Sequence, residues 1–204
     1  MNNNNFDAMK ESFFTDYIRS NVPLTDEQLS TLLEKSKVLA LGRKAFLLSA
    51  GETCCHRFFI EEGAVREYSI DRHGKEHLLH FAVEGWFLMN VESIFFDRPS
   101  SYFIETIEPS RILLLNNEQV NRLAREDKSF EQFDRQLLYE HIHTLQLRIT
   151  GMQSHSAEER YLHFVEHYPE AMLRVPQQMI ASYLGIAPES LSRIRRQLAE
   201  RHFR

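Results

Sequence analysis

The side chains best suited to chemistry lie in one short segment near the C-terminal end of the sequence. Arginine side chains can grip guanine or phosphate, and a glutamate can accept a hydrogen bond from the amino group of cytosine. Serine can bond to either kind of partner. These residue types, grouped at helical spacing, indicate contact with nucleic acid. The candidate DNA-binding side chains are Glu189, Ser190, Ser192, Arg193, Arg195 and Arg196, with Gln177 and Gln178 shortly before them.

Two short helices must position these side chains. Ala181 offers the small side chain that lets two crossed helices approach, and Gly185 adopts a positive φ in the turn at least cost. This spacing is typical of a helix-turn-helix, whose second helix lies in the major groove of DNA. An ordinary hairpin of two helices shares the apolar spacing but does not need a cationic outer face. The buried positions of the pattern are occupied by Ile180, Leu184, Ile186, Leu191 and Ile194.

Charge is distributed unevenly along the 204 residues. Residues 171–204 contain six Arg and two Glu, whereas the 170 residues before them carry 18 basic and 27 acidic side chains. A basic tip on an acidic protein favours a local contact with nucleic acid over a generally adhesive surface. We expect bases to be read by Glu189, Ser190 and Arg193, and phosphates to be held by Gln177, Gln178, Arg195 and Arg196.

Composition excludes several classes of protein. No apolar run approaches the roughly 20 residues that span a bilayer, and the first residues lack a signal peptide. We therefore expect a cytoplasmic protein without membrane contact. The adjacent Cys54 and Cys55 are interpreted as two reduced thiols, with a dithiol sensor as the alternative.

The remaining motifs point away from catalysis and from a bound metal. The sequence has no paired nucleophile and base and no phosphate-binding loop, so we expect no enzymatic activity. His77 and His80 have opposite parity on a predicted strand, and His141 and His143 point apart on a predicted helix. We therefore expect no metal site and no cofactor, with a haem or metal sensor as the less favoured alternative.

The texture of the sequence divides the chain into three parts. Residues 1–127 form two N-terminal helices and a β-rich barrel, 128–153 one long helix, and 154–204 the helix-turn-helix domain. Many short strands at regular spacing imply a sandwich or jelly roll around an apolar interior that can hold a small ligand. Helices are predicted over 6–19, from residue 25, and over 118–125, 128–153 and 157–167. Strands are predicted near 38–41, 45–48, 58–62, 64–70, 76–83, 102–107 and 111–115.

The long helix carries a heptad seam. Its apolar residues step by four, three, four and three, which is the spacing of a coiled coil. A helix of about 25 residues is roughly 37 Å long at 1.5 Å per residue, so it exceeds a small barrel. We predict that the free part of the seam pairs with a second copy; packing on its own barrel is the alternative. The seam consists of Leu138, Ile142, Leu145, Ile149 and Met152.

The order of several short motifs resembles a known family. Residues 58–68 (FFIEEGAVREY), 74–76 (GKE), 84–87 (EGWF) and 159–162 (ERYL) are similar in sequence and spacing to segments of bacterial regulators typified by the cyclic-AMP receptor protein and the fumarate–nitrate regulator, the Crp/Fnr family. The resemblance covers nearly the whole chain. It implies an α+β fold with a cyclic-nucleotide-binding-type β jelly roll, a long dimerisation helix and a C-terminal helix-turn-helix domain.

The resemblance also implies partners and base-reading residues. It implies a homodimeric transcription regulator that binds a pseudo-palindromic site in double-stranded DNA. RNA polymerase and a small-molecule effector are the further partners that it implies. Where the family has Arg-Glu-Thr and a later Arg, this chain has Pro188, Glu189, Ser190 and Arg193. The loss of the first Arg predicts a different preferred DNA sequence. Because residues 201–204 directly follow the helix, we expect a domain without a full β-hairpin wing.

The matching nucleotide site departs from the family. Met89 and Asn90 replace the Gly-Glu pair that holds the ribose, and Ser100 replaces the Arg that holds the cyclic phosphate. Losing this charge-assisted pair costs on the order of a few kcal/mol. We therefore expect little or no binding of cyclic AMP, and we treat Asn90, Arg98, Ser100 and Ser101 as a candidate pocket for another effector.

A second function remains open on the same residues. The missing wing and the missing phosphate Arg also fit a ligand-binding or protein-interaction module whose helix-turn-helix is degenerate. A steep loss of DNA affinity with salt would speak against this module, because counterion release marks phosphate contact.

Overall fold

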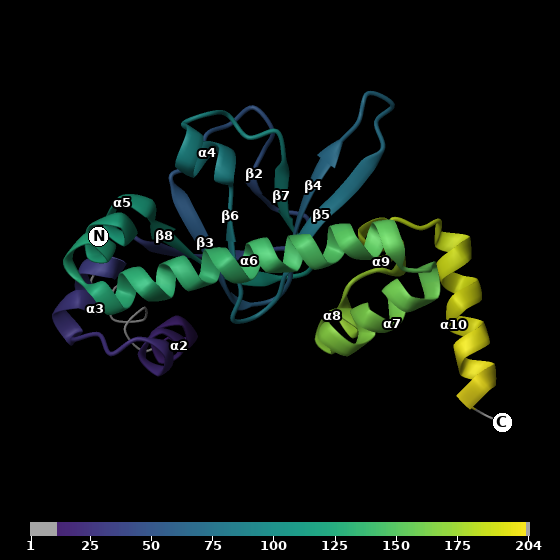
Figure 1. Ribbon diagram of the computed structural model, residues 1–204. Coiled ribbons are helices and arrows are strands. Elements are labelled where there is room, and N and C mark those ends of the chain that lie inside the picture. Colours follow the sequence, from purple (N-terminus) through teal and green to yellow (C-terminus); the bar gives the residue numbers. More distant parts are fainter. Residues whose placement is uncertain (1–11, 203–204) are drawn as a thin grey trace.

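The computed structural model describes residues 12–202, in which two antiparallel sheets form a β-roll above one long helix. Figure 1 shows the N-terminal helices at one end of this long helix and the C-terminal helices at the other. The predicted helix over 6–19 is present from Phe13 onward, and its residues 6–11 lie outside the described part. No helix within 12–202 is long and apolar enough to cross a membrane.

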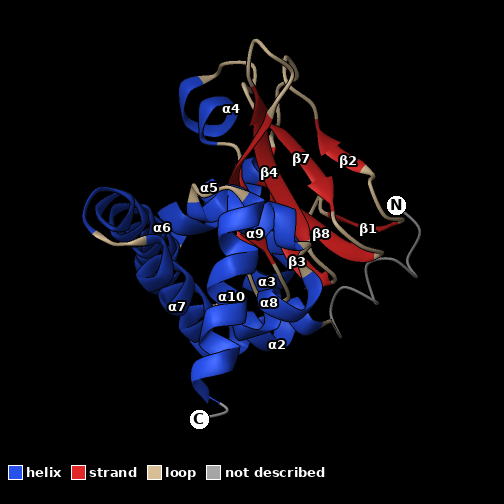
Figure 2. Cartoon of the chain, turned by 90° about the vertical axis from the view of Figure 1, so that its right-hand side faces the viewer, coloured by secondary structure: helices blue, strands red, loops and turns tan. Residues whose placement is uncertain are grey.

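The β-roll consists of eight strands in two sheets of four. Each strand that the sequence predicts is present within two residues of its expected bounds. Figure 2 shows the strands as one block with the helices packed beside it. The first sheet has the order β1 (Lys37–Leu41), β8 (Ser110–Asn116), β3 (His56–Glu62), β6 (Phe87–Met89). The second has the order β2 (Phe46–Leu48), β7 (Phe103–Thr106), β4 (Val65–Ile70), β5 (Glu76–Ala82).

Side-chain alternation explains why β3 and β8 read as continuous hydrophobic runs. Phe58 on β3 and Leu114 on β8 are register partners and point between the two sheets. Their neighbours Phe59 and Leu113 point to the opposite face, toward the N-terminal helices. A strand that is buried on both faces needs apolar residues at successive positions. The interior that we expected to hold a ligand is filled by side chains of Leu48, Phe58, Ile60, Val65, Ala82, Leu88, Ile104, Ile112 and Leu114.

Three helices cover the outer face of the first sheet: α2 (Phe13–Asn21), α3 (Asp26–Leu33) and α5 (Asn117–Glu126). The predicted capping box at Thr25 is present, because its hydroxyl accepts from Gln28 N and Gln28 Oε1 accepts from Thr25 N. Phe14 of α2 meets Phe59 edge-on at 5.1 Å between ring centroids. Aromatic pairs of this geometry add to the stabilisation that burial alone provides.

The long helix α6 (Lys128–Ser154) is anchored to the roll at its N-terminal end. Asp127 caps it by accepting from Phe130 N, and the carboxylate of Asp134 pairs with the guanidinium of Arg57. Arg57 also donates to Asn117 at 2.9 Å. The side chain of Arg57 is only 3% exposed, so its ion pair with Asp134 fixes the angle at which α6 leaves the β-roll.

Four helices follow α6: α7 (Ala157–His167), α8 (Pro169–Arg174), α9 (Gln177–Leu184) and α10 (Pro188–His202). A capping box of Ser156 and Glu159 starts α7. Three short elements were not predicted: β6, α8 and the helix α4 (Val91–Phe96). Each has six residues or fewer, so none contains enough turns or alternations to give a periodic signal.

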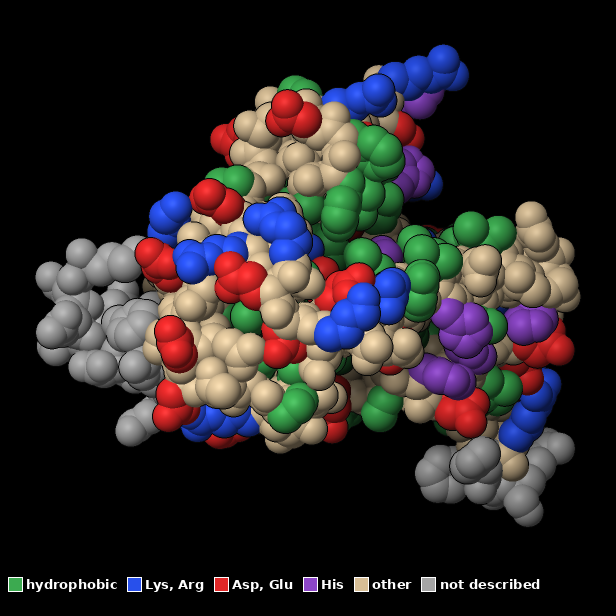
Figure 3. All heavy atoms as spheres, turned by 60° about the vertical axis from the view of Figure 1, so that its left-hand side comes forward, with side chains coloured by type: hydrophobic (Ala, Val, Ile, Leu, Met, Phe, Trp, Pro, Cys, Tyr) green, Lys and Arg blue, Asp and Glu red, His purple; other side chains and the backbone are tan. Residues whose placement is uncertain are grey.

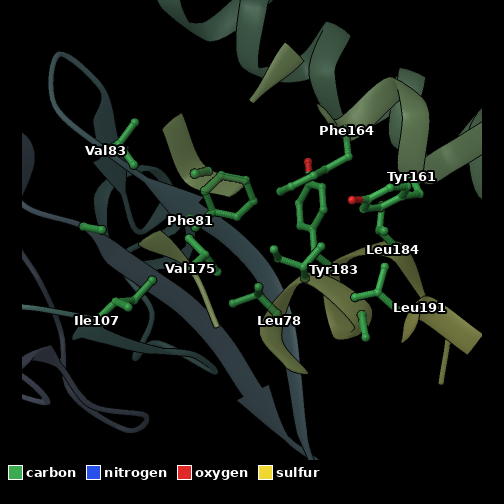
Figure 4. Close-up of a cluster of buried hydrophobic side chains, with 14 of the residues drawn as sticks. Leu78, Phe81, Val83, Ile107, Tyr161, Phe164, Val175, Tyr183, Leu184 and Leu191 are labelled. Carbon is green, nitrogen blue, oxygen red and sulfur yellow. The ribbon is translucent and has the colours of Figure 1, made fainter. Parts of the chain in front are cut away.

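The C-terminal helices pack directly on the edge strand β5. Phe81 meets the rings of Phe164 on α7 and Tyr183 on α9, with centroids 5.7 and 5.0 Å away (Figure 4). One hydrophobic cluster therefore continues from the roll into the last four helices. This shared core positions the helix-turn-helix relative to the β-roll.

We predict that Gly63→Ala destabilises the fold much more than Gly74→Ala. Both glycines have positive φ, at +97° and +77°, which costs a residue with a Cβ about 1–2 kcal/mol. A Cβ at residue 63 would also lie 2.7 Å from Ser110 Cα, whereas residue 74 faces open space. Overpacking of this kind adds about 1–3 kcal/mol. Urea unfolding measures both losses, and equal losses would contradict the close approach of the two backbones.

Candidate functional site

The predicted helix-turn-helix is formed by α9 and α10, and its turn depends on Gly185. That residue ends α9 with φ 65° and ψ 37°, and its N–H donates back to Ser182 O. Ile186 N then donates to Ala181 O at 3.0 Å, which completes the helix C-cap. Ala181 is fully buried where the helices cross. Pro188 occupies the first turn of α10, where its missing N–H costs nothing.

Helical geometry gives α10 one buried and one open side. Leu191 and Ile194 are 1% and 5% exposed and face the other helices. Residues on the opposite side recur three or four positions apart and face outward. The structure exposes Glu189, Ser192, Arg193 and Arg196 on this side, places Ser190 and Arg195 half-buried at its flanks, and exposes Gln177 and Gln178 at the start of α9.

The basic tip is smaller than the charge count suggested. Of its six arginines, Arg174 pairs with Glu84 and Glu108, and Arg201 pairs with Glu158. Within the part of the chain that the structure describes, Arg193, Arg195 and Arg196 form no ion pair with a carboxylate. Three cationic side chains on α10 therefore remain available to an external anion.

Arg148 of α6 joins the roll to the helix-turn-helix. Its guanidinium donates to Leu78 O at 3.0 Å, to Leu79 O, and to Tyr183 O at 3.2 Å, and it lies 4.3 Å from the centre of the Tyr183 ring. Burial lowers the pKa of Arg148. The neighbouring Ser182 hydroxyl accepts from Leu78 N at 3.0 Å. The edge strand β5, the long helix α6 and the first helix of the helix-turn-helix, α9, therefore meet at the guanidinium of Arg148.

The cassette that corresponds to a nucleotide site, residues 89–101, is closed by its own side chains. Asn90 caps α4 by accepting from Ser93 N at 2.9 Å, and its amide donates to Ser100 Oγ at 2.8 Å. Asn90 and Ser100 are 1% and 3% exposed. Arg98 is exposed, and its backbone O accepts from Ser93. The structure thus brings Asn90 and Ser100 together and leaves Arg98 apart from them.

An internal carboxylate occupies the donors of Ser101. Glu92 accepts from Ser101 N at 2.6 Å and from Ser101 Oγ at 3.0 Å. Burial and the nearby charge of Glu92 raise the pKa of Glu67 to about 7. Burial raises the pKa of Tyr102, and the charges of Glu92 and Glu67 raise it further. Glu92 of the cassette and Glu67 of β4 therefore place two carboxyl groups near each other, which opposes a phosphate at this position.

The arginine that precedes Glu67 on β4 is already paired with carboxylates. Arg66 on β4 pairs with Glu105 at 2.8 Å and with Glu76 at 2.5 Å. Its guanidinium carbon lies 4.0 Å from the centre of the Tyr68 ring, and the Tyr68 hydroxyl donates to Glu105. A cation held by two carboxylates contributes little to recognition of an added anion.

Comparison with known proteins gives the class of the β-rich part. Residues 34–127 match the family of the cyclic nucleotide-binding domain. These residues extend from the end of α3 to the residue after α5 and include both sheets. This part of the chain is therefore a cyclic nucleotide-binding domain in fold, with the altered cassette described above.

Solved structures extend the similarity over most of the chain. FixK2 from Bradyrhizobium japonicum has a TM-score of 0.73 at 16% identity, covering 82% of this chain and 86% of that one. A putative regulator of the Crp/Fnr family from Eubacterium rectale has 0.67 at 14%, covering 91% and 88%. The c-di-GMP responsive regulator CLP from Xanthomonas campestris has 0.64 at 16%, covering 87% and 93%. The chain has the fold of Crp/Fnr regulators. The sequence matches no curated protein.

We predict that the free energy of unfolding of Glu67→Gln, compared with that of the parent protein, increases as pH rises. Folded Glu67 keeps its proton up to a pKa of about 7, while the unfolded carboxyl loses it near its ordinary value. Its contribution to stability is therefore present at low pH and is lost as pH rises through about 7. Urea unfolding at pH 5 and pH 8 should show a difference between variant and parent that grows by on the order of 2–3 kcal/mol.

The matched control for this measurement is Glu62→Gln, at an exposed position at the end of β3. Its difference from the parent should stay constant over the same pH range. A constant difference for Glu67→Gln as well would contradict a proton held on Glu67.

Proposed function

We propose that this chain is a homodimeric transcription regulator that reads a two-fold DNA site without cyclic AMP. The outward side of α10 carries the proposal, because Glu189, Arg193 and Arg196 stand there exposed beside Ser192. Arg193 can grip a guanine edge and Glu189 can accept from cytosine. Arg195, Arg196 and the glutamines of α9 are assigned to phosphates, which set the register of the helix in the groove.

The proposed dimer forms along α6. Ile142, Leu145, Ile149 and Met152 are 50%, 37%, 55% and 42% exposed, and Tyr139 beside them is 57% exposed. A row of large apolar side chains at heptad spacing is stabilised when a second helix covers it. Leu138, the first seam residue, is half-buried and lies in the groove between α6 and the β-roll. We therefore assign the dimer interface to the residues from Ile142 onward, without Leu138.

Independence from cyclic AMP follows from the cassette. Glu92 already bonds to Ser101, and Glu67 adds a second carboxyl to the same interior. A bound cyclic phosphate would need to displace one carboxylate and neutralise the other. The solved relatives support the regulator class: the Eubacterium rectale protein is described as a transcriptional regulator, and CLP as a global regulator that responds to c-di-GMP.

The experiment that tests the proposal is a selection of bound sequences from random duplex DNA, with and without cyclic AMP. We expect enrichment of the same two-fold site in both arms, with half-sites about one helical turn, roughly 34 Å, apart. Affinity should fall steeply with salt. A folded protein that enriches no sequence and shows no salt dependence would instead support the protein-interaction module.

We predict that Arg193→Ala weakens binding to the selected site by about 1–3 kcal/mol while sparing most affinity for random DNA, because a base contact is lost. Arg196→Ala is the matched control on the same helix. As a phosphate contact it should weaken all sequences alike and reduce the salt slope by about 1. Fluorescence anisotropy with specific and random duplexes measures both variants. Equal loss on every sequence for Arg193→Ala would contradict the base-reading role.

We predict that Ile149→Asp dissociates the dimer, because it places two unpaired carboxylates in an apolar seam. The dimer dissociation constant should rise by about 100-fold or more. Leu147→Asp is the control: it makes the same change on the same helix at a similar exposure, 44%, but away from the seam. Sedimentation equilibrium measures both variants. A dimer lost only in Leu147→Asp would place the interface on the other face of α6.

A further inference from the structure

A second cavity lies outside the β-roll, where the C-terminal half of α6 meets α7 and α9. Its volume is about 350 Å³, within the range of pockets that hold small molecules. None of the cassette residues lines it. Figure 3 shows histidine side chains gathered next to hydrophobic ones toward the C-terminal end of the molecule. The basic side chains that line the cavity are Arg148, Arg160, His143, His155, His163 and His167.

The lining contains no carboxylate to balance these groups. Arg148 is satisfied by backbone carbonyls alone, so its charge is not compensated. Arg160 donates through Nη1 to His155 O at 2.9 Å, whereas its Nε is buried and has no partner among the described residues. Glu166 lies 4.0 Å from His167 but outside the lining. Two uncompensated guanidinium groups around one cavity favour an anion.

The floor of the cavity is apolar and aromatic. Phe164, Tyr168 and Tyr183 line it together with Leu147 and Leu184. On its rim the imidazole rings of two histidines, one turn apart on α7, stack at 3.9 Å. Imidazole N–H groups can donate to an anionic oxygen, and aromatic rings can stack on a flat apolar body.

We propose that this cavity is a binding site for a small organic anion with an apolar, flat body. The anionic group would meet Arg160 and the histidines of the rim, and the body would lie on Phe164 and Tyr183. This chemistry is opposite to that of the cassette, where Glu92 and the neighbouring Glu67 are acidic. The region between α6 and the helix-turn-helix would therefore bind an anionic effector.

The position of the cavity gives the anion a means of acting on DNA binding, a step that rests on the proposed function. The lining joins α6, which carries the dimer seam, to α9, the first helix of the helix-turn-helix. Met152 belongs both to the lining and to the exposed seam. A ligand that binds one arrangement of these helices more tightly shifts the population toward it.

The test uses a matched pair of fluorescent probes. 1-Anilinonaphthalene-8-sulfonate carries an anionic group on a flat apolar body, and N-phenyl-1-naphthylamine has nearly the same body without the charge. Titrated into the full-length protein, the sulfonate should bind at one site per chain and at least about tenfold more tightly than the neutral probe, because a charge-assisted contact contributes roughly 1.5–3 kcal/mol.

Three variants locate the bound probe. Arg160→Gln should weaken the sulfonate about tenfold or more and leave the neutral probe unchanged. Thr150→Phe, from the α6 wall, should weaken both probes by filling the cavity. Arg125→Gln, an exposed arginine on α5 outside the lining, should change neither. Circular dichroism and thermal unfolding check that each variant is folded.

Two results would overturn the site: equal affinity for the charged and neutral probes, or sulfonate binding that survives both Arg160→Gln and Thr150→Phe in folded protein. These measurements do not involve DNA, so they can fail while the DNA selection succeeds, and the reverse. If the sulfonate binds as expected, its effect on affinity for the selected duplex then tests the regulatory step separately.

Discussion

The arrangement of the β-roll and the C-terminal helices depends on the half-buried guanidinium of Arg148. It takes up backbone carbonyls of β5 and of α9, and it lies against the ring of Tyr183. A charge at this depth is stable only when several acceptors face it, so the three elements must keep their relative positions. The aromatic contacts of Phe81 and the ion pairs of Arg174 reinforce the same junction. The orientation of α10 relative to the β-roll follows from this docking.

The two candidate effector regions have opposite electrostatic character. In the cassette, Ser100 stands in place of the expected arginine, and Glu92 accepts the hydrogen bonds of Ser101. Around the outer cavity, the guanidinium groups of Arg148 and Arg160 are held without a carboxylate in the lining. The β-roll therefore has the fold of a cyclic nucleotide-binding domain, with altered residues where a phosphate would be held. The better place for an anion lies beside the helices that would transmit its effect.

Local patterns predicted much of the fold, and long-range pairing explains the rest. The turn at Gly185 and the helical stretch of α6 are encoded in local sequence, so both were predicted correctly. Arg148 was missed because it lies between seam positions and its acceptors are backbone oxygens 69 and 70 residues earlier and 35 residues later in the chain. Arg174 was counted with the basic tip because a charge count does not reveal its pairing with Glu84. The bonding of Asn90 to Ser100 likewise appears only after α4 folds.

The docking of α9 on β5 has a consequence for solubility. β5 is the last strand of its sheet, and its outer edge at Leu78 and Leu79 would otherwise present unpaired N–H and C=O groups. Ser182 and Arg148 take up these groups, so the reader covers an edge to which another strand could add. If α9 moves away from β5, the N–H and C=O groups of this edge are exposed. Another segment must then cover them, because two exposed strand edges can pair between chains.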